Sequence, residues 1–117
     1  MIHLDYETYS PLDLTEVGVF KYAEHPEAEI LMCAVASETE GPFLLVNPKW
    51  ESVRASDPRA ASLVQRALHD KSEMWAHNAL FEFAITRALS LQLGFFPPEI
   101  EQWRCTALLC RRAGFPA

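Results

Sequence analysis

The feature that most constrains the fold is the alternation of apolar and polar residues in IHLDYE, at positions 2–7. Successive side chains of a β-strand point to opposite faces of the sheet. The apolar side chains would therefore share one face and the polar ones the other: Ile2, Leu4 and Tyr6 against His3, Asp5 and Glu7. Two carboxylates on one strand face can bind a hard cation such as Mg²⁺ or Mn²⁺. The alternative is an ordinary solvated sheet surface.

Length and composition predict a single compact α/β domain spanning residues 1–117. Half of the residues are hydrophobic, which suffices for a core and argues against disorder. The formal net charge of −6 disfavours unspecific attraction to nucleic acid, although bound divalent metal can offset a carboxylate cluster. Cys33, Cys105 and Cys110 are an odd number without paired spacing, which predicts reduced thiols and no zinc site. Without a leader or a membrane-length apolar run, we expect a soluble cytoplasmic protein with no membrane contact.

Periodicity and turn residues predict the remaining elements. Residues 12–22 show no clean period and predict a loop with one helical turn. Strands are predicted at residues 29–37, where the apolar run suggests burial on both faces, and at 43–46, 73–76 and 100–106. Helices are predicted at residues 58–69, from 78 to near 93, and at 107–113.

The order of these elements predicts a mixed sheet of about five strands flanked by helices. Short turns favour an antiparallel arrangement of the first three strands, and the later strands alternate with helices. This pattern is compatible with a ribonuclease-H-like architecture and also with other small α/β sheets.

A second stretch that carries chemistry is HNALFE, at residues 77–82. Asn78 and Glu82 are four residues apart, so both can share one helix face near the positive N-terminal end. If the strand at 73–76 lies parallel beside the first strand, they emerge close to Asp5 and Glu7.

Each residue of this stretch also has a plain structural interpretation. Asn78 can be a helix cap, Glu82 a solvated acid in the first helical turn, and His77 a loop histidine. We leave His77 out of the predicted catalytic set.

Taken together, the motifs resemble the 3′→5′ exonuclease domain of polymerase-I-type (family A) DNA polymerases, especially phage forms, within the four-acid proofreading exonucleases. The resemblance lies in LDYETYSPLDLTEVGVFKYAEHPEAEILMCAVA at 4–36, in HNALFE, and in WRCTALLCRRAGFP at 103–116. The first motif of the family, an acid-x-acid pair followed by threonine, is matched by Asp5, Glu7 and Thr8. The second ends more often in aspartate than in a glutamate such as Glu82.

The resemblance implies two-metal hydrolysis of single-stranded DNA from its 3′ end, with Mg²⁺ or Mn²⁺ as the two divalent cations. It implies catalytic and metal-binding roles for three acids, Asp5, Glu7 and Glu82, with Asp5 bridging both metals. It implies substrate binding by Thr8, Asn78 and Phe81.

One departure from the family pattern is large. The third motif of the family, Tyr-x-x-x-Asp or His-x-x-x-x-Asp, lies on a helix further downstream than HNALFE, where this sequence has no match, so we expect a domain incomplete at its C-terminus and impaired in catalysis. Apolar surface exposed in this way would favour a homodimer, with candidate contacts at Trp103, Leu108, Leu109 and Phe115. Three alternatives remain: an exonuclease acting on RNA, a non-catalytic remnant that binds nucleic acid or protein, and an acidic domain with incidental carboxylates.

Overall fold

A computed structural model describes residues 1–114 of the chain, and of Leu109 and Cys110 the backbone alone. Its centre is a five-stranded sheet with the order β3-β2-β1-β4-β5. β1 (Ile2–Tyr9) pairs antiparallel with β2 (Glu29–Ser37), and β2 pairs antiparallel with β3 (Phe43–Val46). β4 (Met74–Ala76) runs parallel to β1, and β5 (Trp103–Cys105) runs parallel to β4. The predicted mixed sheet of five strands with flanking helices is confirmed.

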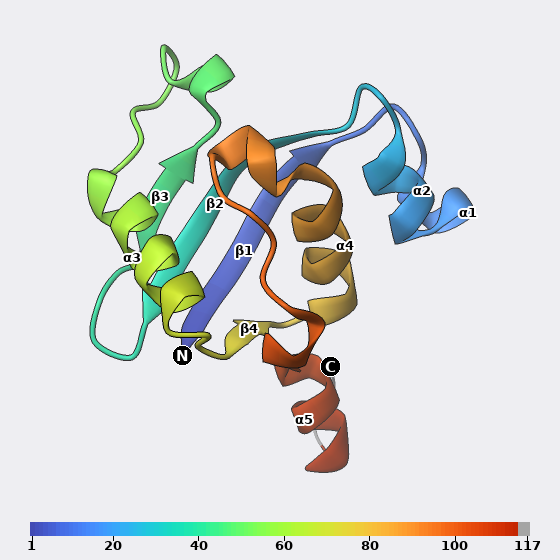
Figure 1. Cartoon of the computed structure of the whole chain (residues 1–117). Helices are drawn as coiled ribbons and strands as arrows, with labels where there is room; N and C mark the ends of the chain where they lie inside the picture. The colour runs from blue at the N-terminus through green and yellow to red at the C-terminus, as the bar shows by residue number, and fades with distance from the viewer. Residues whose placement is uncertain (115–117) are drawn as a thin grey trace.

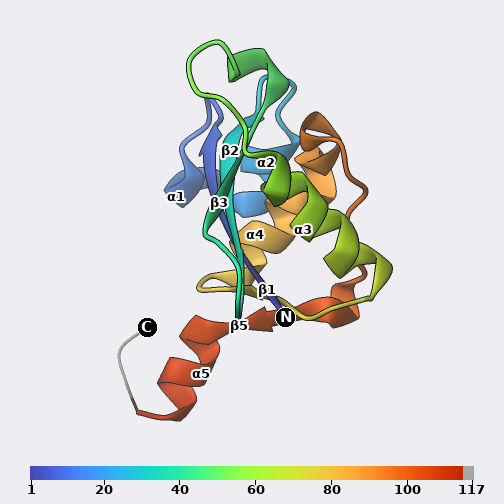
Figure 2. The same ribbon diagram turned by 90° about the vertical axis from the view of Figure 1, so that its left-hand side faces the viewer.

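Two long helices, α3 (Pro58–His69) and α4 (Ala79–Leu89), lie on the same face of the sheet (Figures 1 and 2). We call this the covered face. α1 (Leu14–Val17) and α2 (Val19–Glu24) follow β1, and α5 (Thr106–Arg112) extends away from the sheet (Figure 2). Short 3-10 turns occupy Pro48–Trp50, Ser90–Leu93 and Ile100–Gln102.

The helix α3 has the bounds that the sequence predicts. The Asp57 side chain accepts a hydrogen bond from the Arg59 backbone N–H at 2.9 Å, and Pro58 occupies the first helical position. The residues that α3 buries against β2 and β3 recur three and four positions apart, namely Ala60, Leu63, Val64 and Ala67. Local sequence and tertiary packing therefore agree in this element.

The core lies between the covered face and these two helices. From β1 it takes Ile2, Leu4 and Tyr6, which are 1%, 4% and 5% exposed. The Tyr6 hydroxyl lies 2.7 Å from Thr86 Oγ1, a buried hydrogen bond that joins β1 to α4. The predicted division of β1 into an apolar and a polar face is thus confirmed.

Three predictions about individual segments are wrong in part. Residues 12–22 form two short helices rather than a loop, because Asp13 caps α1 and α2 packs on α4, with Gly18 (φ +80°) between them. β2 is fully buried on one face only, since the other face carries no long helix. In the segment 100–106 a 3-10 turn precedes a strand of three residues.

Other predictions have a mixed outcome. Cys33 is buried and Cys105 partly exposed, both as free thiols, whereas the Cys110 side chain lies outside the described residues. Of the dimer contacts, Leu108 is exposed and Trp103 half-buried, while the Leu109 side chain and Phe115 are not described. No helix within residues 1–114 is long and apolar enough to span a membrane.

Candidate active site

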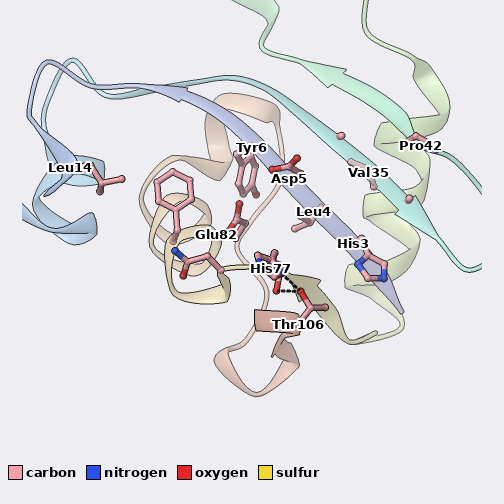
Figure 3. Close-up of a pocket in the computed structure, with 15 residues that line it drawn as sticks. His3, Leu4, Asp5, Tyr6, Leu14, Val35, Pro42, His77, Glu82 and Thr106 are labelled. Carbon is pink, nitrogen blue, oxygen red and sulfur yellow. Dashed lines mark hydrogen bonds between the residues drawn. The ribbon is translucent and has the colours of Figure 1, made fainter. Parts of the chain in front are cut away.

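The face of the sheet opposite α3 and α4 carries a pocket of about 790 Å³. We call this the open face. Its central residues come from β1 and β2, where Asp5 pairs with Ala34 and His3 with Ala36. The pocket brings together residues of β1, β2, β4, α1, α4 and α5 (Figure 3), among them His3, Asp5, Ala34, His77, Asn78, Phe81, Glu82 and Thr106.

Asp5 and Glu82 meet because β4 is much shorter than β1. β4 pairs only with Ile2 and His3, so β1 has a free edge from Leu4 onward. The Ile2 backbone N–H donates to Glu73 on this edge at 2.9 Å, and alternation directs the Tyr6 N–H to the same side. The Glu82 carboxyl of α4 occupies that edge, facing the Tyr6 amide and close to Asp5.

The environment of Glu82 is unfavourable for a free carboxylate. The residue is 6% exposed, and burial raises the pKa of its carboxyl to about 7. The negative charge of Asp5 acts in the same direction, while the backbone amides of Glu82 and Tyr6 partly oppose the shift. Glu82 is therefore not a solvated first-turn acid, and a bound cation would stabilise its charged form.

Asn78 occupies the N-cap position of α4, but its side chain makes no capping hydrogen bond. The residue is exposed and lines the pocket, so its amide can reach a ligand there. Phe81 lines the same pocket and packs against the core, with its ring centroid 6.3 Å from that of Tyr22. The interpretation of Asn78 as a simple helix cap is thus not supported by its side chain.

Glu7 and Thr8 are not among the residues that line the pocket. Glu7 is exposed on the open face, and a β-bulge follows it in the pairing of β1 with β2. Thr8 Oγ1 lies 3.0 Å from the Tyr22 hydroxyl, which ties β1 to α2. Among the described residues, no three His, Cys, Asp or Glu side chains are grouped as ligands of one metal ion. The structure brings Asp5 and Glu82 together and leaves Glu7 outside their pocket.

The unpredicted residues of the pocket include three polar ones, His3, His77 and Thr106. His3 lies on the same face of β1 as Asp5, so the alternation of the strand could have indicated that His3 belongs to the site. His77 Nδ1 lies 3.0 Å from Thr106 Oγ1 (Figure 3). The Ala107 backbone N–H also donates to the His77 carbonyl, at 3.1 Å. Thr106 belongs to the segment WRCTALLCRRAGFP of the resemblance, but only the parallel pairing of β4 with β5 brings it to the pocket.

Comparison with known proteins gives one informative match. Over 116 residues the chain is 31% identical to a DNA polymerase of Bacillus phage SP02. The chain is similar to a part of that polymerase. The alignment covers 98% of this chain and 16% of the phage protein, so the chain spans about a sixth of its relative's length. No protein-family model and no solved structure matches the chain.

Proposed function

We propose that this chain is a 3′→5′ exonuclease domain of a polymerase-I-type DNA polymerase that hydrolyses the 3′ end of single-stranded DNA. The observation that carries the proposal is the buried carboxyl of Glu82 beside Asp5 in an open pocket. Two acids held so close, one of them poorly solvated, are typical of a site built for a cation.

The fold and the comparison support the same proposal. Three antiparallel strands followed by the parallel strands β4 and β5, with helices between them, are what a ribonuclease-H-like architecture requires. The similarity to a phage DNA polymerase extends over nearly the whole chain, so the aligned stretch spans the positions of both acidic motifs.

The donor set suits two divalent cations, Mg²⁺ or Mn²⁺, because the ligands are carboxylate oxygens. Asp5 and Glu82 would hold them directly, and Glu7 would contribute from the neighbouring position on the same face of β1. When bound, such ions lower the pKa of a water molecule and stabilise the leaving oxygen of a phosphodiester.

The chain's own residues would bind and orient the DNA end. The Asn78 amide stands at the N-terminal end of α4, where the backbone potential is positive and favours a phosphate. Phe81 offers an apolar surface beside it, and Thr8 would support the position of the terminal nucleotide through its tie to α2.

We expect this activity to be weak. Among residues 1–114 only two carboxylates line the pocket, and two close cations need several to offset their charge. The same observation favours a second candidate, a non-catalytic remnant of this fold that binds nucleic acid or a protein. The two candidates differ in whether Asp5 is needed for any reaction.

The test is manganese-dependent release of mononucleotides from a 3′-terminal labelled oligodeoxynucleotide by the purified chain. We expect slow release of mononucleotides, which Asp5→Ala abolishes. An oligoribonucleotide of the same sequence, assayed in parallel, tests whether the chain prefers DNA to RNA. Release that survives Asp5→Ala would refute the site. A complete absence of release, together with retained binding of the oligonucleotide, would favour the remnant.

Metal binding can be tested without any reaction. Mn²⁺ should raise the melting temperature of the wild-type chain at pH 8, where Glu82 is ionised, and much less at pH 5. The Asp5→Ala variant should lose most of this stabilisation. An equal effect of Mn²⁺ on both chains would place the ion elsewhere.

A further inference from the structure

A second pocket lies on the open face, beyond Glu7. It measures about 230 Å³ and is lined by Leu31, Met32, Val46, Trp50, Val53 and Arg54. We call it the Trp50 slot. Its floor is in register with the acidic strand, because Glu7 pairs with Met32 and Met32 pairs with Val46. Directly paired residues share one face, so the slot and the two acids of β1 face the same side.

We propose that the Trp50 slot binds a nucleobase of single-stranded DNA, upstream of the terminal nucleotide. The inference rests on the proposed function, since it assigns a second subsite to the same substrate. Its volume is below the roughly 300–1,000 Å³ of pockets for drug-sized ligands, and suits a single planar ring system. Bases stack on aromatic side chains whatever their sequence.

The slot offers apolar and aromatic surface on which a base can stack. Val53 is 80% exposed at the slot, a large apolar side chain that the fold leaves in water. The indole nitrogen of Trp50 is buried and has no hydrogen-bond partner within residues 1–114. The fold therefore makes no use of the polar atom of Trp50, and what this residue contributes is aromatic surface.

Two basic side chains, Lys49 and Arg54, stand at the slot although the chain is acidic overall. Lys49 Nζ lies 5.3 Å from the centroid of the Trp50 ring, and Arg54 is exposed at the slot itself. Residues 49–54, the segment that carries Trp50, hold two basic side chains and one acidic side chain, against a net charge of −6 for the whole chain. Lys49 also pairs with Glu29 at 3.0 Å; its own side chain is 64% exposed, so the ammonium also faces solvent, where it can meet a phosphate.

The position of the slot fits a strand whose end lies at Asp5. Neighbouring strands are about 4.8 Å apart and residues along a strand about 3.3 Å, so Val46 lies roughly 12 Å from Asp5. At about 3.4 Å per stacked nucleotide this is roughly three to four nucleotides. The connection from β3 to α3, which carries Trp50, stands at the end of the sheet where β1 also ends (Figure 1).

The experiment measures DNA binding without hydrolysis, in EDTA, by fluorescence anisotropy of labelled oligothymidylates of two and eight nucleotides. Trp50→Ala should weaken binding of the eight-nucleotide strand by about five- to a hundredfold and leave the dinucleotide within about twofold. Trp50→Phe, which keeps a ring, should retain most of the affinity. The matched control is Phe96→Ala, which removes an aromatic side chain 76% exposed in a different pocket.

A second variant covers the case in which Trp50→Ala does not fold. Val53→Glu changes an exposed side chain at the slot. It should weaken the binding of the eight-nucleotide strand and leave that of the dinucleotide unchanged, because it adds a negative charge and removes apolar surface. Arg54→Ala should lower the salt dependence of binding by about one phosphate contact.

The outcomes separate this inference from the proposed function. Equal affinity of wild type and Trp50→Ala for the longer strand would overturn the slot, whether or not the chain cleaves DNA. The slot would also be overturned if Phe96→Ala lost as much affinity for the longer strand as Trp50→Ala, or if the wild-type chain did not bind that strand. Selective loss with Trp50→Ala in a chain that never releases nucleotides would support the slot and refute the nuclease.

Discussion

The two faces of β1 carry the same alternation but opposite roles. On the covered face, Ile2, Leu4 and Tyr6 are at most 5% exposed and pack against α3, α4 and the other core residues. On the open face, Asp5 and Glu7 are exposed beside a pocket that neither long helix fills. The same strand thus contributes to the core on one face and to the candidate site on the other.

Glu82 is the residue at which the two faces meet. Its backbone belongs to α4, which packs on the covered face, but its carboxyl reaches the free edge of β1 beside Asp5. The packing of α4 on the covered face therefore buries Glu82, whereas its charged neighbour, Asp5, belongs to the open face. The candidate site therefore depends on where β4 ends as much as on which residues are acidic.

The largest expected effect is that of Asp5→Asn, on the open face of β1. We expect metal-dependent release of nucleotides to fall by at least about a thousandfold, because removing one group from a catalytic unit removes most of its rate. The free energy of unfolding should change by no more than about 0.5 kcal/mol, since Asp5 is exposed. Release assays and urea unfolding of the same preparation check both halves. A large loss of stability would mean that the open face also holds the fold together.

The converse change is Leu4→Ala, one residue earlier on the covered face. Leu4 is 4% exposed, and truncating a buried leucine costs about 2–5 kcal/mol of unfolding free energy. Urea denaturation followed by circular dichroism measures it. Glu7→Ala, on the open face, is the matched control and should stay within about 0.5 kcal/mol. Similar losses for both variants would contradict the division of β1 into two roles.

Glu82→Gln tests the residue shared by both faces. The folded-state pKa is about 7, above the usual value, so the folded state disfavours ionisation of this carboxyl. Its stability contribution is present at low pH and lost as pH rises through 7. Glutamine does not ionise, so the variant should gain on the order of 1–2 kcal/mol over wild type between pH 4.5 and 8, allowing for solvent screening.

Thermal unfolding of Glu82→Gln across this pH range gives the measurement. Glu7→Gln, at an exposed carboxyl on the open face, is the control and should show no such pH-dependent gain. A Glu82→Gln difference that stays constant from pH 4 to 8 would mean that Glu82 ionises normally in the folded chain.

The smallest expected effect concerns the hydrogen bond that joins β1 to α4 on the covered face. Tyr6→Phe removes the hydroxyl that lies 2.7 Å from Thr86 Oγ1, at a cost of about 1 kcal/mol. Thr86 keeps its own bond to the Glu82 carbonyl, so it is not left without a partner. Tyr9→Phe, at a side chain 48% exposed, should change nothing measurable in the same unfolding experiment. A cost well above 2 kcal/mol would show that this bond positions α4 as a whole.

Much of the fold could be predicted because its signals are local. The bounds of β2, β3 and α3 follow from an apolar run, a short turn and the Asp57-Pro58 cap. The segment 12–22 could not be predicted in this way, since α1 and α2 are short helices that depend on packing against α4. β5 is shorter than its pattern because only three of its residues find a partner in β4.

By itself, the sequence determined the acidic face of β1 and the placing of Asn78 and Glu82 on one helix face, since both follow from strand and helix periods. Only the tertiary structure decided which acids share a pocket. The early end of β4 admits Glu82 to the edge of β1, and Glu7 stays outside their pocket. The same is true of His77 and Thr106, which meet through the parallel pairing of two strands far apart in the chain. Periodicity fixes the direction of a side chain within its own element, whereas the length and register of neighbouring strands fix what it meets.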